Sequence, residues 1–225
     1  MIEKTDSPTT SARALVVTGL QRRYPNGGGV GPLDLELEAG GLLAILGPSG
    51  CGKSTLLRIL AGLEPADRGS IQVDGQAVDR LPPGRRSIGL VEQHLPLYDH
   101  LDVHANVDMA VSGLALERNE RRSRVTQALS IAGAESFGSH KAATLSGGER
   151  ARTCLARLLA RRATVALLDE PFAGLDRGLR DRVRRDTLQS LSSAGAATIM
   201  VTHDDRDLDP DGEVLELDSN GRRIG

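Results

Sequence analysis

Five apolar residues at 42–46 are followed by a glycine-rich segment that ends in Gly-Lys-Ser-Thr, and few folds accommodate this order. The apolar run is typical of a buried strand, and residues 56–62 predict a helix that is closed by a glycine. Glycines let backbone N–H groups converge on an anion, and the start of a helix adds the positive end of its dipole. The order therefore predicts a phosphate-binding loop made of Gly47, Pro48, Ser49, Gly50, Cys51, Gly52, Lys53, Ser54 and Thr55.

Two side chains of this loop suit a bound phosphate chain and its metal ion. Lys53 can reach the outer phosphates, and the hydroxyl of Ser54 can bind Mg²⁺. The alternative is a glycine turn that contains an incidental lysine. The chain has three lysines, Lys4, Lys53 and Lys141, so an accidental lysine at this position is less expected.

Composition limits the class of protein. A chain of 225 residues forms one large domain or a core with a sizeable insertion. The net charge of −2 and the 2% aromatic content argue against a nucleic-acid-binding surface. The two cysteines, Cys51 and Cys154, fit a reducing compartment rather than a disulfide. No apolar run approaches the length that crosses a bilayer, so a membrane role would require a partner protein.

The remaining pattern predicts an α/β core interrupted by a helical block. Residues 1–13 are polar without an apolar stretch, which predicts a disordered tail rather than a signal peptide. A turn-rich loop is expected at 21–29. Runs that are apolar throughout favour strands covered on both faces, as in a parallel sheet. Strands are expected at 14–18, 33–37, 42–46, 70–74, 87–91, 164–168, 197–201 and 213–217. Helices are expected from a cap at Asp102 to about 114, and at 117–132, 147–161 and 180–191.

Asp169 and Glu170 follow the apolar run 164–168 directly. Ligands of open α/β sheets sit at the carboxyl ends of strands, so Asp169 could support Mg²⁺ and Glu170 could polarise a water for attack on a terminal phosphate. A pair of solvated acids at the start of a loop is an equally good interpretation of these two residues alone.

A second anion site is indicated at Ser146, Gly147 and Gly148, which open the predicted helix 147–161. Bare backbone N–H groups at the positive end of a helix favour an anion. Taken alone, an ordinary serine-capped helix explains this segment better. One nucleotide does not need two phosphate sites in one chain, whereas two copies arranged head to tail would use both.

Together, these motifs resemble the nucleotide-binding domain of ATP-binding-cassette (ABC) transporters. The resemblance covers about residues 14–217 and rests on the phosphate loop, Gln93, the segment Leu145-Ser146-Gly147-Gly148-Glu149, the pair Asp169-Glu170, Asp176 and His203. It implies a P-loop NTPase (RecA-like) core with an antiparallel β subdomain and an inserted α-helical subdomain. The cassette would span residues 14–225, and the helical subdomain about 94–145.

The resemblance also implies roles for individual residues. Tyr24 would stack on adenine, with a turn tyrosine as the alternative. Gln93 would contact Mg²⁺ and water, with a surface amide as the alternative. Asp176 would belong to a loop that crosses the dimer interface, and His203 would contact the terminal phosphate. Contacts to the nucleotide of the opposite subunit would come from Ser146, Gly147 and Gly148.

The sequence departs from the family pattern at several points. Glu149 stands where a glutamine is usual, a change that such domains tolerate, and Glu92 replaces an apolar or aromatic residue, which could alter a docking surface. Pro210 makes a helix after His203 improbable. The sequence as given ends at residue 225 without the C-terminal regulatory barrel of some import ATPases.

The resemblance implies an ATPase subunit that uses Mg-ATP to power transport through a separate membrane permease. It would act on the cytoplasmic face of the cell membrane, paired with a second copy or a homologous cassette, together with a substrate-binding protein in an importer. Residues 87–101 look like import ATPases of the iron, thiamine, polyamine and sugar group. Candidates for docking the permease are Leu95, Leu97 and Tyr98, with packing inside the helical subdomain as the alternative.

Two other functions stay open from the sequence. A non-transport ABC ATPase would act on DNA or ribosomes, but such proteins usually carry coiled coils, tandem cassettes or basic arms, and no nucleic-acid partner is expected here. A small-molecule P-loop kinase would share the phosphate loop. The Ser-Gly-Gly segment and His203 argue against the kinase.

Overall fold

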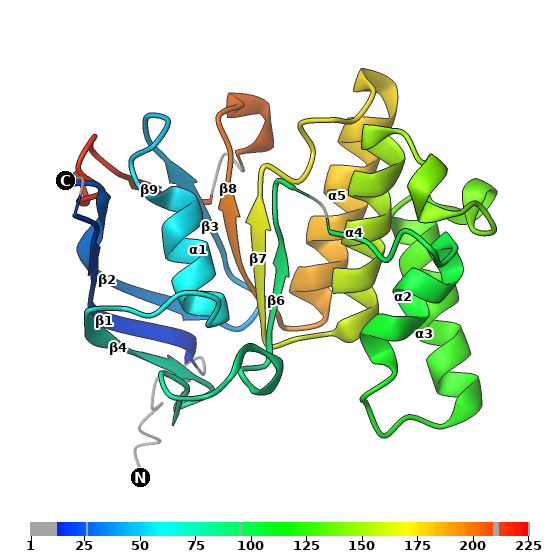
Figure 1. The fold of residues 1–225 in the computed structure, drawn as a ribbon, viewed down its shortest axis with the longest axis horizontal. Coiled ribbons are helices and arrows are strands. Elements are labelled where there is room, and N and C mark those ends of the chain that lie inside the picture. Colours follow the sequence, from blue (N-terminus) through cyan, green and yellow to red (C-terminus); the bar gives the residue numbers. More distant parts are fainter. Residues whose placement is uncertain (1–12, 26, 95, 209–211, 225) are drawn as a thin grey trace, which may run out of the picture.

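The computed structural model describes residues 13–25, 27–94, 96–208 and 212–224 (Figure 1). The predicted tail, apart from Arg13, lies outside the described residues, as do Leu95 and Pro210. Arg13 already belongs to the first strand. In the described part of the chain, no helix combines the length and the apolar character that crossing a bilayer requires.

Two sheets form the framework. The antiparallel sheet has the order β2 (Gly29–Glu38), β1 (Arg13–Arg23), β4 (Arg68–Val73) and β5 (Gln76–Ala77). The parallel sheet has the order β6 (Ile88–Val91), β7 (Val165–Asp169), β8 (Ala197–Val201), β3 (Leu42–Leu46) and β9 (Glu213–Glu216). The predicted combination of a parallel core and an antiparallel β unit is therefore confirmed.

Helices cover the parallel sheet on both sides (Figure 1). The helices are α1 (Lys53–Ala61), α2 (Val103–Val111), α3 (Arg118–Ile131), α4 (Gly147–Arg161) and α5 (Arg177–Ser193). Short 3₁₀ turns occur at Pro83–Arg85, Glu135–Phe137, Ala142–Thr144 and Asp205–Asp207. Helix α1 lies between the two sheets, and α4 and α5 separate the parallel sheet from α2 and α3.

Strand β7 explains why the apolar runs do not alternate. Val165 and Leu167 pack in the core that contains α1 and the antiparallel sheet. Ala166 and Leu168 pack in the second core, with α2 to α5. Because both faces of the strand are buried, residues 165–168 are all apolar, as expected for a parallel sheet.

The predicted loop over 21–29 was too long at both ends. β1 continues through Arg23, which pairs with Gly29 of β2. The ladder hydrogen bonds hold these polar residues in a strand even though their side chains carry no apolar pattern. The turn is consequently restricted to the segment between Arg23 and Gly29, where Tyr24 N donates to Gly28 O at 2.8 Å.

The first helix of the helical block, α2, begins at the N-cap that the sequence predicted, Asp102. Asp102 accepts a hydrogen bond from Ala105 N at 2.7 Å, the geometry of an N-cap. Both α2 and α3 pack against α4 in the second core. Gly133 follows α3 with a φ of 65°, which suits a glycine that ends a helix.

Arg86 holds the end of α1 in place, and an alanine there is expected to destabilise the fold. Its side chain is 6% exposed and donates to the carbonyls of Ile59 and Leu60, at 3.0 and 3.1 Å, and to those of Asp79 and Leu81. Arg86→Ala removes four hydrogen bonds that join separate segments, so the free energy of unfolding should fall by about 3 kcal/mol. Urea denaturation measures this, with a change at the exposed Arg85 as the control. Equal stability of the two variants would contradict the role of Arg86.

Candidate functional site

The glycine-rich loop connects the end of β3 to the uncapped N-terminus of α1. Gly52 precedes the helix with a φ of +105°, and a Cβ there would lie 2.2 Å from the carbonyl oxygen of Gly29. Only glycine fits this position. No side chain caps α1, so N–H groups of its first turn are available to an anion.

Lys53 lies across the loop. Its Nζ donates to the carbonyl oxygens of Gly47 and Pro48, at 2.8 and 2.9 Å. The side chain of Cys51 is buried beneath it, with the sulfur 3.9 Å from the ammonium group. A bound phosphate would offer Lys53 a charged acceptor, which forms a stronger hydrogen bond than these neutral carbonyls.

Asp169 ends β7 as a buried carboxylate, only 7% exposed. Burial raises the pKa of Asp169 above its ordinary value, and the nearby Glu170 adds to the rise, whereas a hydrogen bond from the Ser54 hydroxyl opposes it. A buried anion of this kind gains from a cation placed beside it.

The donor set around Asp169 fits Mg²⁺. It consists of carboxylate and hydroxyl oxygens, which Mg²⁺ prefers, and Mg²⁺ usually takes one or two carboxylates and completes its shell with water and substrate phosphates. Among the described residues, no group of three or more His, Cys, Asp or Glu side chains could hold a metal ion by itself. A cation bound at Asp169 would therefore share the phosphates of a nucleotide.

Asp169→Asn is expected to stabilise the ligand-free protein at neutral pH. Since burial raises the pKa of Asp169, folding favours the protonated carboxyl, and the ionised form present above the folded-state pKa reduces stability. Asparagine removes that charge, so the free energy of unfolding at pH 7 should rise by about 1 kcal/mol. The gain should shrink as the pH falls through the raised folded-state pKa and vanish below the ordinary pKa of 3.8, where both states carry a proton. Urea denaturation along a pH series tests this, and a destabilised variant at pH 7 would refute it.

Glu170 has an unusual backbone conformation and a histidine partner. Its φ of 48° lies in the left-handed region, and its N–H donates to Val201 O at 3.0 Å. One carboxylate oxygen lies 3.1 Å from Nδ1 of His203, whose side chain is 70% exposed. A carboxylate that is oriented by a second group and reaches a cleft has the geometry of a general base.

A cleft of about 370 Å³ collects most of the predicted residues. Its lining includes the predicted residues Tyr24, Ser49, Gly50, Gly52, Lys53, Ser54, Thr55, Gln93, Asp169 and Glu170. The sequence did not indicate Gly28, Gly29 or Val201, which also line it. Gly28 and Gly29 follow Tyr24 in a run of three glycines, a signal that could have identified them. Gly47, Pro48 and Cys51 belong to the loop but do not line the cleft.

Tyr24 contributes an aromatic ring to this cleft. Its hydroxyl donates to Glu64, and the Arg22 guanidinium lies 5.1 Å from the ring centroid. Arg22 covers one face of the ring, so a base would have to stack on the opposite face.

Ser146, Gly147 and Gly148 do not line this cleft. Ser146 caps α4 in a capping box, and the Glu149 carboxylate accepts from its N–H and hydroxyl, at 2.9 and 2.8 Å. Glu149, which stands where the family usually has glutamine, therefore has a structural role: its carboxylate is a good acceptor for the hydrogen bonds of the capping box. A Cβ on Gly148 would lie 2.9 Å from the Gly174 carbonyl oxygen, so the loop that leads to Asp176 packs against the start of α4.

The loop after β8 is fixed to α5 by ion pairs that the sequence did not indicate. Arg180 bonds Asp204 at 2.9 Å and Asp207 at 2.8 Å, and all three side chains are mostly buried. The hydroxyl of Thr202 also donates to Asp207 at 2.8 Å. Between His203 and β9, the described residues form only a short 3₁₀ turn, Asp205–Asp207.

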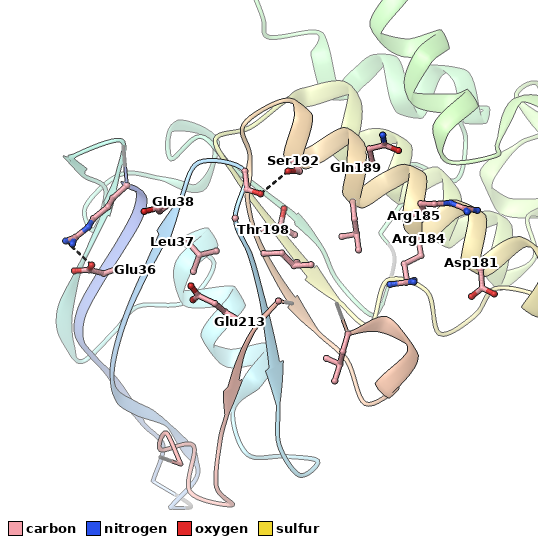
Figure 2. Close-up of a pocket in the computed structure, with 17 residues that line it drawn as sticks. Glu36, Leu37, Glu38, Asp181, Arg184, Arg185, Gln189, Ser192, Thr198 and Glu213 are labelled. Atoms are coloured by element: carbon pink, nitrogen blue, oxygen red, sulfur yellow. Dashed lines mark hydrogen bonds and ion pairs between the residues drawn. The ribbon is translucent and has the colours of Figure 1, made fainter. Parts of the chain in front are cut away.

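A larger cleft of about 1020 Å³ lies at the starts of β3, β8 and β9, beside α5 and the turn between β2 and β3 (Figure 2). Its lining mixes arginines with acids, and Arg13 is already paired with Glu36 at 2.8 Å. None of the predicted site residues is among the residues that line it.

The parallel sheet, the glycine loop before α1 and the two acids at the end of β7 define a P-loop nucleotide-binding fold. Comparison with known families agrees and is more specific. Residues 30–173 match the family described as "ABC transporter". The match covers more than half of the chain, so the chain belongs to the ABC transporter family, and the resemblance seen in the sequence is confirmed.

Individual relatives support the same assignment. The sn-glycerol-3-phosphate import ATP-binding protein UgpC of Chromohalobacter salexigens is 38% identical over 191 residues, covering 84% of this chain and 52% of the relative. The putrescine transport ATP-binding protein PotG of Escherichia coli is 39% identical, covering 84% and 50%. The chain thus spans about half the length of these curated relatives. A dimeric ATP-binding cassette, MJ0796, solved in a post-hydrolysis state with ADP and Pi, superimposes with a TM-score of 0.83 at 28% identity, covering 94% of this chain and 97% of that one.

Proposed function

We propose that this chain is the ATP-binding and ATP-hydrolysing subunit of an ABC transporter. The observation that carries the proposal is the cleft that brings Lys53, Ser54 and Asp169 together with Glu170, which His203 contacts. The cassette would span residues 14–225, with a helical subdomain at about 94–145.

The residues of the cleft would have different roles in the transfer of a phosphoryl group to water. Lys53 and the N–H groups of the loop would neutralise the phosphates, and Glu170 would take the proton of the attacking water. His203 would hold Glu170 and contact the terminal phosphate. Ser54, Gln93 and Asp169 would hold Mg²⁺, which when bound would neutralise charge that develops on the phosphate oxygens.

The second anion site supports a head-to-tail pair of cassettes. Ser146, Gly147 and Gly148 lie outside the cleft that would hold the chain's own nucleotide, and the loop to Asp176 lies beside them. In a two-fold dimer they would contact the terminal phosphate held by the other subunit. That subunit would be a second copy or a homologous cassette. Binding ATP in the seam would favour the closed dimer.

The named functions of the relatives support a role in import. UgpC is named as an import ATP-binding protein, and PotG is named as a transport ATP-binding protein. We infer that this chain binds a membrane permease at the cytoplasmic face of the membrane and serves a system with a substrate-binding protein.

Affinity purification from native membranes tests the partner. A tagged Glu170→Gln variant, incubated with Mg-ATP, should retain the closed complex because hydrolysis is blocked. Co-purification of a multi-span membrane protein supports transport. Recovery of ribosomal or DNA-associated proteins without such a protein would refute the transport role and leave the ATPase chemistry standing.

Tyr98 is the best candidate for contact with the permease. Its ring is 45% exposed, and Arg157 lies 5.5 Å from the ring centroid. Leu97, in contrast, packs against the second core, which favours its packing role. Tyr98→Ala should reduce co-purified permease about tenfold, the loss typical of an aromatic contact residue, without changing ATP affinity. Val214→Ala, at another exposed apolar residue, is the control. Unchanged assembly of the Tyr98 variant would exclude this docking site.

A further inference from the structure

A continuous chain of polar contacts joins the two ends of the cleft. The hydroxyl of Tyr24 donates to Glu64, and Nε of Arg58 lies 2.7 Å from the other oxygen of the same carboxylate. Nη1 of Arg58 lies 2.6 Å from Glu92. Arg58 therefore bridges two carboxylates, of which one holds Tyr24 and the other directly precedes Gln93.

Three separate segments meet at this arginine. Arg58 belongs to α1, the helix that begins with Lys53 in the phosphate loop. Glu64 follows the end of α1, and Glu92 follows β6. The side chains of Arg58, Glu64 and Glu92 are 41%, 24% and 24% exposed, so the two carboxylates are more sheltered than ordinary surface acids.

The charge of Glu92 makes its pairing important. Glu92 lies close enough to Asp169 to contribute to the raised pKa of that carboxyl. A free carboxylate there would also repel a bound triphosphate. The Arg58 guanidinium offsets this charge. Glu92, where the sequence departs from the family pattern, thus pairs with Arg58 of α1.

We propose that Arg58 is a positioning residue that couples Tyr24, at the base end of the nucleotide, to Gln93, at the phosphate end. The proposal rests on the function proposed above, because it assigns Tyr24 and Gln93 to ATP. Arg58 does not line the cleft, so it acts through Glu64 and Glu92. The alternative is that the contacts Tyr24–Glu64, Arg58–Glu64 and Arg58–Glu92 act independently. Each contact would then hold its own segment in place, but a change at Tyr24 would have no effect at Gln93.

A double-mutant cycle between the two ends separates these cases. Tyr24→Phe removes the hydroxyl that donates a hydrogen bond to Glu64. Glu92→Gln removes the negative charge that pairs with Arg58. The two residues share no direct contact in the structure. We expect the double variant to lose about threefold less in kcat/KM for ATP than the product of the single losses, a coupling typical of one network. In an Arg58→Gln background the coupling should disappear.

The control cycle pairs Tyr24→Phe with Arg121→Gln, which breaks a comparably exposed ion pair with Asp108 in the helical block. In this control, the loss of kcat/KM in the double variant should equal the product of the losses in the two single variants. Losses that also multiply for Tyr24→Phe and Glu92→Gln in the wild-type background would overturn the proposal.

The cycle of Tyr24→Phe and Glu92→Gln can also be measured without ATP hydrolysis. The measured quantity is then the dissociation constant of a fluorescent ATP analogue, mant-ATP. A wild-type chain that binds mant-ATP but hydrolyses no ATP would refute the proposed ATPase activity. The binding cycle would still support or overturn the role of Arg58. Thermal melting of each variant excludes losses that come from unfolding.

Discussion

A Glu170→Gln variant is expected to bind ATP as the wild-type chain does and to hydrolyse it about 100-fold more slowly or worse, because general-base catalysis supplies at least about that factor. Glutamine keeps the size of the side chain, but its amide cannot take a proton from water. Since ATP would persist, dimers should accumulate. Steady-state phosphate release and size-exclusion chromatography with Mg-ATP measure the two effects.

Glu216→Gln is the matched control. Glu216 is an exposed carboxylate on β9, outside the cleft lining, and its loss should leave turnover unchanged. Normal turnover of the Glu170 variant would exclude Glu170 as the base, whatever the control does. The His203 contact at 3.1 Å would then have to serve binding rather than catalysis.

Lys53→Ala is expected to raise the dissociation constant for ATP about 100-fold, a loss of about 2.7 kcal/mol. The ammonium group now satisfied by the carbonyls of Gly47 and Pro48 is the charged donor of the loop, and alanine cannot reach the phosphates. Titration with mant-ATP measures the constant directly.

Lys141→Ala tests whether the loss is specific to the site. Lys141 is exposed and donates to the His100 carbonyl at 3.2 Å in the helical block. We expect its replacement to leave the affinity for ATP unchanged. Equal affinity of the Lys53 variant and the wild type would refute the phosphate role of Lys53.

The sequence was most informative where local chemistry decides the structure. The run 164–168 predicted a strand buried on both faces because the side chains of residues 165–168 all pack in a core. Ser146 predicted a helix start because its hydroxyl satisfies an N–H group of that helix. The phosphate loop was predicted for the same reason, since its glycines allow a backbone that other residues would block.

Contacts between distant segments were not predictable in this way. The extension of β1 through Arg23 depends on pairing with Gly29, and nothing in the residues 21–23 themselves indicates a partner strand. The ion pairs of Arg180 with Asp204 and Asp207 join residues more than twenty positions apart. An arginine on a helix is usually a solvated side chain, so only the fold reveals that this one is buried.

The backbone at Glu170 would link the catalytic role proposed above to the stability of the fold. A residue other than glycine in the left-handed region costs about 1 kcal/mol, and Glu170 occupies that region with a φ of 48°. A gene copy relieved of turnover would gain fold stability by exchanging this glutamate for glycine. In an assembly of two unlike cassettes of which only one had to hydrolyse ATP, that exchange would cost the other cassette no stability. The conformation of one residue thus provides a route from a pair of equal sites to one working and one silent site.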